Sequence, residues 1–139
     1  MRYLSLDLGI KSCGICVSDP TNIIPVPVEN FMFPRGDFLT ALYQVKFYVE
    51  KYKITTIILG YPIRTDGKKS QATIQVEEFK TLLENAFDKK IKIELIDETN
   101  STKRGLELLA RTKKSPENLK NKKDVMAAYI IMQDFLMNV

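Results

Sequence analysis

The chain of 139 residues contains no histidine and only two cysteines. A structural zinc site draws its ligands mainly from these two residue types, so the sequence excludes one. Cys13 and Cys16 have the spacing of a redox pair, but Ile15 and Val17 continue a strand where such a pair would begin a helix. Residues three apart on a strand point to opposite faces, and we therefore interpret both cysteines as small buried residues.

Long hydrophobic runs are also missing. No stretch approaches the roughly 18 consecutive apolar residues that cross a membrane, and Arg2 and Asp7 interrupt the start of the chain, which argues against a signal peptide. We therefore expect a cytoplasmic protein that does not associate with membranes. With 45% hydrophobic and 27% charged residues, the composition fits a single globular domain over residues 1–139 with a sizeable core.

Acidic residues are scarce in one segment. Between Arg111 and Lys123, six basic residues stand against Glu117 alone, and this local charge of +5 accounts for the whole formal net charge of +4. A basic segment of this kind suits a polyanionic partner, although a lysine-rich surface can also be merely solvated. We expect nucleic acid as the partner, with contacts from Lys113, Lys114, Lys122 and Lys123.

The most informative stretch that is present runs from Tyr3 to Gly9. It alternates as a strand, with the leucines on one face and with Tyr3, Ser5 and Asp7 on the other. An ionised carboxylate at the end of a buried strand is costly without water or a partner, and Gly9 lets a ligand or backbone come close. Asp7 is therefore a candidate site residue; the alternative is a strand end that emerges into solvent.

Two further strands are predicted over residues 13–18 and 23–33, and the prolines at 25 and 27 mark the second of them as an edge. A helix capped by Asp37 follows. The β-branched run from Ile54 to Leu59 is typical of a parallel strand buried on both faces.

The second half of the chain predicts a helix, a strand and two more helices. The helix spans about 70–87 and directs five apolar residues inward, namely Ala72, Val76, Phe79, Leu83 and Ala86. A fifth strand covers 91–96. A third helix begins after the capping residues 99–101, and the last helix starts near Asn121.

This order of elements predicts an α/β fold with a mixed five-stranded sheet, in which the first three strands are antiparallel and helices lie on both faces. The first, fourth and fifth strands should run parallel. Asp7, Gly60 and the Asp97-Glu98 pair then reach the same edge of the sheet, and open α/β sheets bind ligands at that edge.

Four acidic residues can meet there: Asp7, Asp97, Glu98 and Asp124, the last at the start of the final helix. Clustered carboxylates repel one another unless a cation intervenes, and oxygen ligands without histidine favour Mg²⁺ or Mn²⁺. Two such ions can clamp a phosphodiester and generate the attacking hydroxide.

Each acid also has a structural interpretation. Asp124 could complement a helix dipole, by roughly 0.3–1 kcal/mol. Asp97 could cap the third helix, and Glu98 could pair with Lys103 or Arg104. The alternation of faces along the fifth strand does not decide between Asp97 and Glu98 as the ligand.

Four short motifs occur in order along the chain: Leu6-Asp7-Leu8-Gly9 with Lys11 and Gly14, Gly60-Tyr61-Pro62 followed by Asp66-Gly67, Asp97-Glu98 with Ser101-Thr102, and Asp124 with Ala127-Ala128. Together they resemble the YqgF family of Holliday junction resolvases, also described as nucleases that mature the precursor of small-subunit ribosomal RNA. The resemblance implies a ribonuclease H-like fold. It also implies that Asp7, an acid of the Asp97-Glu98 pair, for which we take Glu98, and Asp124 are catalytic and bind metal.

Two positions depart from the family pattern, because Ser12 and Thr99 stand where an arginine is usual. Candidates for phosphate contact in their place are Lys11, Arg64, Lys103 and Arg104. We predict a nuclease dependent on Mg²⁺ or Mn²⁺ that acts on structured RNA or branched DNA, as a monomer or homodimer. The alternative is a catalytically weak nucleic-acid-binding module of the same fold. A phosphate-handling kinase is set aside, because actin-like kinases need two such domains and the chain can hold one.

Overall fold

The computed structural model describes residues 2–62, 68–97 and 116–138, with the backbone alone for 116–124. Five strands form one sheet in the order β3-β2-β1-β4-β5. The strands are β1 (Arg2–Leu8), β2 (Ser12–Ser18), β3 (Pro25–Met32), β4 (Ile54–Tyr61) and β5 (Lys92–Asp97). β1 pairs antiparallel with β2, and β2 with β3, whereas β1, β4 and β5 run parallel. The predicted mixed sheet is confirmed.

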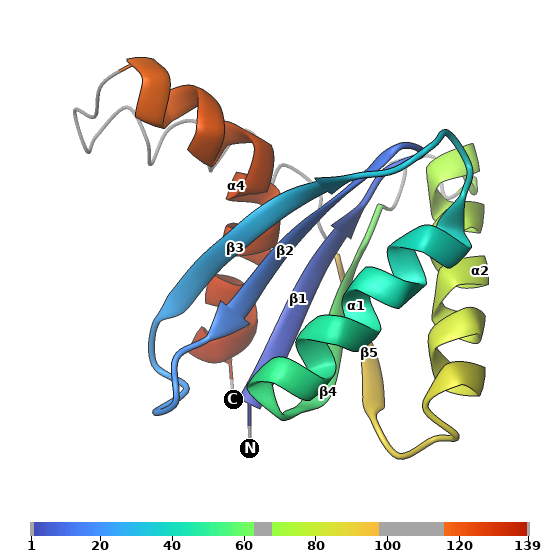
Figure 1. Cartoon of the computed structure of the whole chain (residues 1–139), viewed down its shortest axis with the longest axis horizontal. Helices are drawn as coiled ribbons and strands as arrows, with labels where there is room; N and C mark the ends of the chain where they lie inside the picture. The colour runs from blue at the N-terminus through green and yellow to red at the C-terminus, as the bar shows by residue number, and fades with distance from the viewer. Residues whose placement is uncertain (1, 63–67, 98–115, 139) are drawn as a thin grey trace.

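Helices cover both faces of the sheet (Figure 1). Helices α1 (Phe38–Tyr52) and α2 (Gln71–Ala86) pack on one face, and α4 (Pro116–Met137) packs on the other. We call these the α1/α2 face and the α4 face. Because the parallel crossovers enter at one end of the sheet, the C-terminal ends of β1, β4 and β5 share one edge.

Local side chains explain where the first two helices begin. The Asp37 carboxylate accepts from the backbone N–H of Thr40, and the Ser70 hydroxyl accepts from that of Thr73, so each fills an N-cap. Lys53 ends α1 in the left-handed conformation, with φ of 54°, and releases the chain directly into β4.

The larger core lies on the α1/α2 face. It joins the leucines of β1 with Ile57 and Leu59 of β4, and with Val45 of α1 and Phe79 of α2. A second, smaller cluster on the α4 face contains Cys16, Ile58, Ala128, Ile131 and Met132. Adjacent residues Ile57 and Ile58 thus face opposite layers, which confirms that β4 is buried on both sides.

The cysteines fit this alternation. Cys13 and Cys16 are both buried and unbridged, and they belong to the α1/α2 and α4 clusters respectively. The interpretation as small buried residues is confirmed.

Two details of the predicted helices were wrong. Ala72 is exposed, and Thr73 takes its place as the buried residue of that turn, because the Thr73 hydroxyl donates to the Pro62 carbonyl at 2.6 Å. The last helix begins at Pro116, five residues before Asn121, as proline favours the first helical turn. The predicted third helix lies outside the described residues.

Candidate functional site

Asp7 is the last residue but one of β1 and is half-buried on the α4 face. Two residues earlier on that face, the Ser5 hydroxyl donates to the Ala128 carbonyl of α4 at 2.7 Å. At the start of the strand, the Tyr3 ring meets the Phe135 ring edge-on, with centroids 4.9 Å apart. The predicted sharing of one face by Tyr3, Ser5 and Asp7 is therefore confirmed.

The strands on either side of Asp7 present glycine. Gly14 of β2 is its register partner. On the other side Leu6 pairs with Leu59, and the same register carried one residue further places Gly60 of β4 beside Asp7. Since neither glycine carries a Cβ, the sheet leaves room around the carboxylate on the α4 face.

The direction of α4 relates Asp124 to this position. From Tyr3 to Ser5 along β1, the contact on α4 moves back from Phe135 to Ala128, so the helix and the strand run in opposite directions. Two more residues along β1 reach Asp7, and one helical turn before Ala128 is Asp124. The backbone thus brings the two positions to the same end of the sheet, while the Asp124 side chain lies outside the described residues.

Asp97 ends β5 at the same edge but on the opposite face. Gly60 pairs with Ile96, and Tyr61 pairs with Asp97. Ile96 packs against the α4 cluster, so Ile96 shares the face of Asp7, and Asp97 falls on the α1/α2 face, where it is exposed. Glu98 lies outside the described residues. Among the described side chains, no three metal-ligating groups come together.

The predicted nucleic-acid contacts are only partly visible. Lys11 is exposed in the turn between β1 and β2, and this turn is braced because the Lys11 carbonyl accepts from the Phe33 N–H at 3.0 Å. Arg64, Lys103, Arg104, Lys113 and Lys114 lie outside the described residues. Lys122 and Lys123 lie on the first half of α4, one turn or less from Asp124, with their side chains not described.

Besides burial, the negative charge of Asp7 contributes to a raised pKa of the neighbouring Cys13 thiol. Burial, followed by the negative charges of Asp7 and Glu29, raises the pKa of the Cys13 thiol far above its usual range. No cation among the described residues forms an ion pair with Asp7. A half-buried carboxylate in an open position, with oxygen donors as its predicted neighbours, fits a hard divalent cation such as Mg²⁺ or Mn²⁺.

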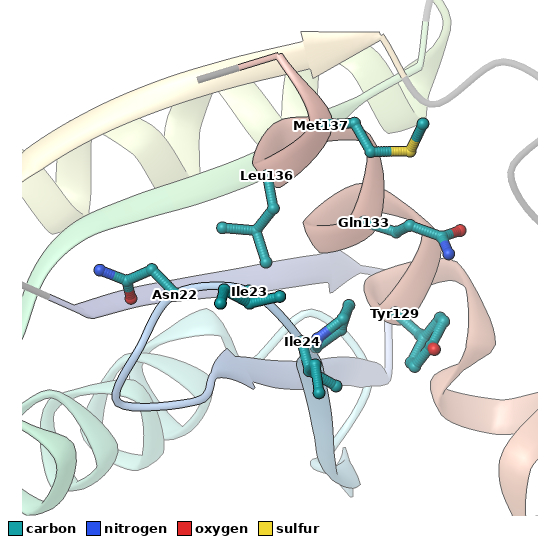
Figure 2. Close-up of a pocket in the computed structure, with 8 residues that line it drawn as sticks. Asn22, Ile23, Ile24, Tyr129, Gln133, Leu136 and Met137 are labelled. Carbon is teal, nitrogen blue, oxygen red and sulfur yellow. The ribbon is translucent and has the colours of Figure 1, made fainter.

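A hollow of about 410 Å³ lies away from Asp7, between the β2–β3 turn and the C-terminal half of α4. Figure 2 shows Ile23 and Ile24 opposite Tyr129 and Leu136. Its lining contains no charged side chain, and it lies at the other end of α4 from Asp124. It therefore contains no carboxylate that could bind a metal.

Sequence reasoning missed the parts that frame Asp7. Ser5 was assigned only to a face, yet its hydroxyl anchors α4 against β1. The close approach follows from Ala127 and Ala128, two small residues that are both buried. Gly14 and Gly60 appeared in the motifs without a role, because their position beside Asp7 depends on the register between strands.

Comparison with known proteins places the chain. The model of the RuvX family, described as a Holliday junction resolvase, matches residues 1–138. A candidate pre-16S rRNA nuclease of Mycoplasmopsis pulmonis is 43% identical over 139 residues, which covers 99% of this chain and 94% of the relative. A protein of the same name from Mycoplasmopsis synoviae is 35% identical over 136 residues, covering 98% of this chain and 97% of its own.

Solved structures agree on the fold. RuvC of T. thermophilus, in complex with a Holliday junction substrate, superposes with a TM-score of 0.63 at 11% identity, covering 100% of this chain and 97% of that one. The Fowlpox virus resolvase, in complex with Holliday junction DNA, gives 0.62 at 15% identity, covering 99% and 98%. The expected ribonuclease H-like fold is confirmed.

Proposed function

The chain belongs to the RuvX family, and from this premise we propose that it is an endonuclease that hydrolyses phosphodiester bonds in structured nucleic acid. One observation carries the proposal. Asp7 stands half-buried at the C-terminal end of β1, flanked by two glycines, on the face to which α4 brings Asp124. A carboxylate in that position can hold a cation against a phosphate without being buried itself.

The proposed substrate is the precursor of 16S ribosomal RNA. Relatives that match nearly the whole chain at 35–43% identity carry the name of candidate pre-16S rRNA nuclease. Branched DNA is the second candidate, because the family is described as a Holliday junction resolvase and two structures of the same fold hold junction DNA.

The proposed metal ligands are Asp7, Glu98 and Asp124. Within the acidic pair, Glu98 is favoured over Asp97, because alternation along β5 puts Asp97 on the face away from Asp7. Asp97 ends β5 and can still orient Glu98, the next residue in the sequence. When bound, Mg²⁺ or Mn²⁺ would activate water and neutralise charge that develops on the phosphate oxygens. Lys11, Lys122 and Lys123 would hold the flanking phosphates.

The test is a gel assay of wild-type protein on a pre-16S RNA and on a four-way DNA junction, each with Mg²⁺, Mn²⁺ or EDTA. We expect cleavage of the RNA with either cation and none in EDTA. Cleavage of the junction alone would transfer the function to branched DNA. Tight binding of both substrates with no cleavage under any condition would contradict the nuclease and leave the binding module.

Metal binding is tested separately by thermal unfolding. Mn²⁺ should raise the melting temperature of the wild type by mass action, and the double variant Asp7→Asn with Asp124→Asn should lose that rise. The matched control is Glu78→Gln, which removes one exposed carboxylate from α2 on the opposite face. A rise that survives in the double variant would place the cation elsewhere.

A further inference from the structure

The solvent side of α1 carries large apolar side chains that no described residue covers. Leu39, Tyr43 and Phe47 are 55%, 66% and 53% exposed. Their spacing of four residues puts them on one stripe of the helix, while Leu42, Val45 and Val49 face the core. Together Leu39, Tyr43 and Phe47 form a contiguous exposed apolar stripe, and such a surface rimmed by polar residues is typical of a binding site.

Lysines accompany both rings. The Lys46 Nζ lies 6.0 Å from the centroid of the Tyr43 ring, and the Lys51 Nζ lies 5.8 Å from that of Phe47. A hollow of about 610 Å³ opens between this stripe and the end of α2, and it is lined by Tyr43, Lys46, Phe47, Val49, Glu50 and Phe87. We call the surface formed by Leu39, Tyr43 and Phe47 with Lys46 and Lys51 the aromatic ridge.

Positive charge dominates around the ridge. Lys53 ends α1, and Lys89 and Lys90 follow Phe87 closely; all three are exposed. With Lys46 and Lys51 they make five lysines, and the acids in the same segments are Glu50 and Asp88. Flat rings beside cations suit a partner that has both a negative backbone and flat, stackable groups.

We propose that the aromatic ridge binds unpaired RNA, with bases stacked on Tyr43 and Phe47 and with phosphates held by the surrounding lysines. Alternating aromatic and basic side chains bind single strands in this way, largely without regard to sequence. The inference rests on the proposed nuclease function and adds a second contact to it. The ridge lies on the α1/α2 face (Figure 1), so it would grip a flanking single strand while the α4 face holds the bond to be cut.

A second copy of the chain is the competing occupant. It is disfavoured because pairing two ridges would bring together two surfaces with the same excess of positive charge. The uncharged hollow beside α4 (Figure 2) shows the contrast, since its lining carries no lysine for a phosphate.

The chain contains no tryptophan, so the Phe47→Trp variant carries a single indole at the centre of the ridge. Titration with an unstructured RNA oligonucleotide in EDTA, where no cleavage is expected, should quench its fluorescence and follow the same curve as binding measured by anisotropy. Adding Asp7→Asn to the variant should leave the quench unchanged. The contact is thereby measured apart from catalysis, so a failure of the nuclease function would not be mistaken for a failure of the ridge.

Substitution of Tyr43 and Phe47 distinguishes stacking on the rings from nonspecific hydrophobic contact. Tyr43→Leu with Phe47→Leu keeps the apolar bulk but removes both rings, and it should weaken RNA binding by about tenfold or more. Tyr43→Phe keeps the ring and should bind like wild type. Lys46→Gln with Lys51→Gln should lower the salt dependence of binding.

Either of two results would overturn the proposal. One is unchanged RNA affinity in the double leucine variant, with no quench of the indole. The other is a wild type that sediments as a dimer and a leucine variant that sediments as a monomer, with equal RNA affinity for both, which would assign the ridge to a second copy of the chain.

Discussion

The two faces of the sheet differ in how much they bury. Among the described residues, the α1/α2 face holds a cluster of eighteen buried residues, and the cluster that joins α4 to the sheet holds five. Both layers contain polar groups. Thr73, the Cys13 thiol and the half-buried Glu29 carboxylate lie on the α1/α2 side. The buried Ser5 hydroxyl, the Cys16 thiol and the half-buried Asp7 carboxylate lie on the α4 side.

This difference separates stability from chemistry. Beside the deep apolar core a carboxylate needs hydrogen-bond donors, because burying an unpaired charge is costly, and the Glu29 carboxylate accepts from the Tyr48 hydroxyl and the Gln44 amide of α1. A thin layer with small residues lets a carboxylate stay accessible at its margin. We conclude that the α1/α2 face holds the fold together, while the α4 face carries the proposed site.

Substitution of a large core residue should show the first half of this comparison. Phe79 of α2 is fully buried and meets the Phe38 ring at a centroid distance of 6.2 Å. Phe79→Ala should cost about 3–5 kcal/mol of unfolding free energy, measured by urea denaturation. Ile74→Ala, at an exposed position of the same helix, should change it by less than about 0.5 kcal/mol. A loss of unfolding free energy in Phe79→Ala as small as that in Ile74→Ala would mean that α2 is not part of the main core.

Ionisation of the Cys16 thiol on the α4 face should lower the free energy of unfolding at alkaline pH. Burial raises the pKa of its thiol from 9.0 to about 12, against a lowering by the Ser5 hydrogen bond. Because the folded-state pKa is the higher one, the stabilisation is complete below pH 9 and is lost as the pH rises toward 12. In that window Cys16→Ala should flatten the fall in stability by about 1.4 kcal/mol per pH unit. Equal slopes of stability against pH for wild type and Cys16→Ala would show that Cys16 ionises in the folded state as readily as in the unfolded state.

The smallest effect concerns the bond between Ser5 and Ala128. Ser5→Ala removes the hydroxyl that donates to the α4 carbonyl and should cost about 0.5–1.5 kcal/mol. Hydrogen exchange should rise in α4 while α1 and α2 keep the wild-type pattern. An equal rise in all three helices would mean that the two faces do not open separately.

The sequence was sufficient for the topology because its signals are local. Alternation in residues 3–9, the prolines at 25 and 27 and the β-branched run at 54–59 each report burial or edge position directly. The predicted edge position of the third strand and the parallel run of the first, fourth and fifth strands were correct. The inward-facing residues of the second helix were less predictable, since Thr73 is buried with its hydroxyl bonded to the distant Pro62 carbonyl, which no local pattern reveals.

The site was predictable only in outline. That Asp7 and the fifth strand meet at one edge follows from parallel pairing, but the face of Asp97 depends on the register between β4 and β5. Register is a long-range property that one strand does not encode. The same holds for the pairing of Asp7 with Gly14 and for the approach of α4 through Ser5.

Single-turnover cleavage by Asp7→Asn, with filter binding on the same preparation, tests whether the α4 face carries the active site. The substitution keeps the size of the side chain and removes the charge that a cation needs. If the α4 face carries the chemistry, cleavage of the pre-16S RNA should fall by about a thousandfold or more, with folding and affinity near those of wild type. The control Glu78→Gln on the other face should cleave normally. Equal cleavage by wild type and Asp7→Asn would show that Asp7 is not part of the active site.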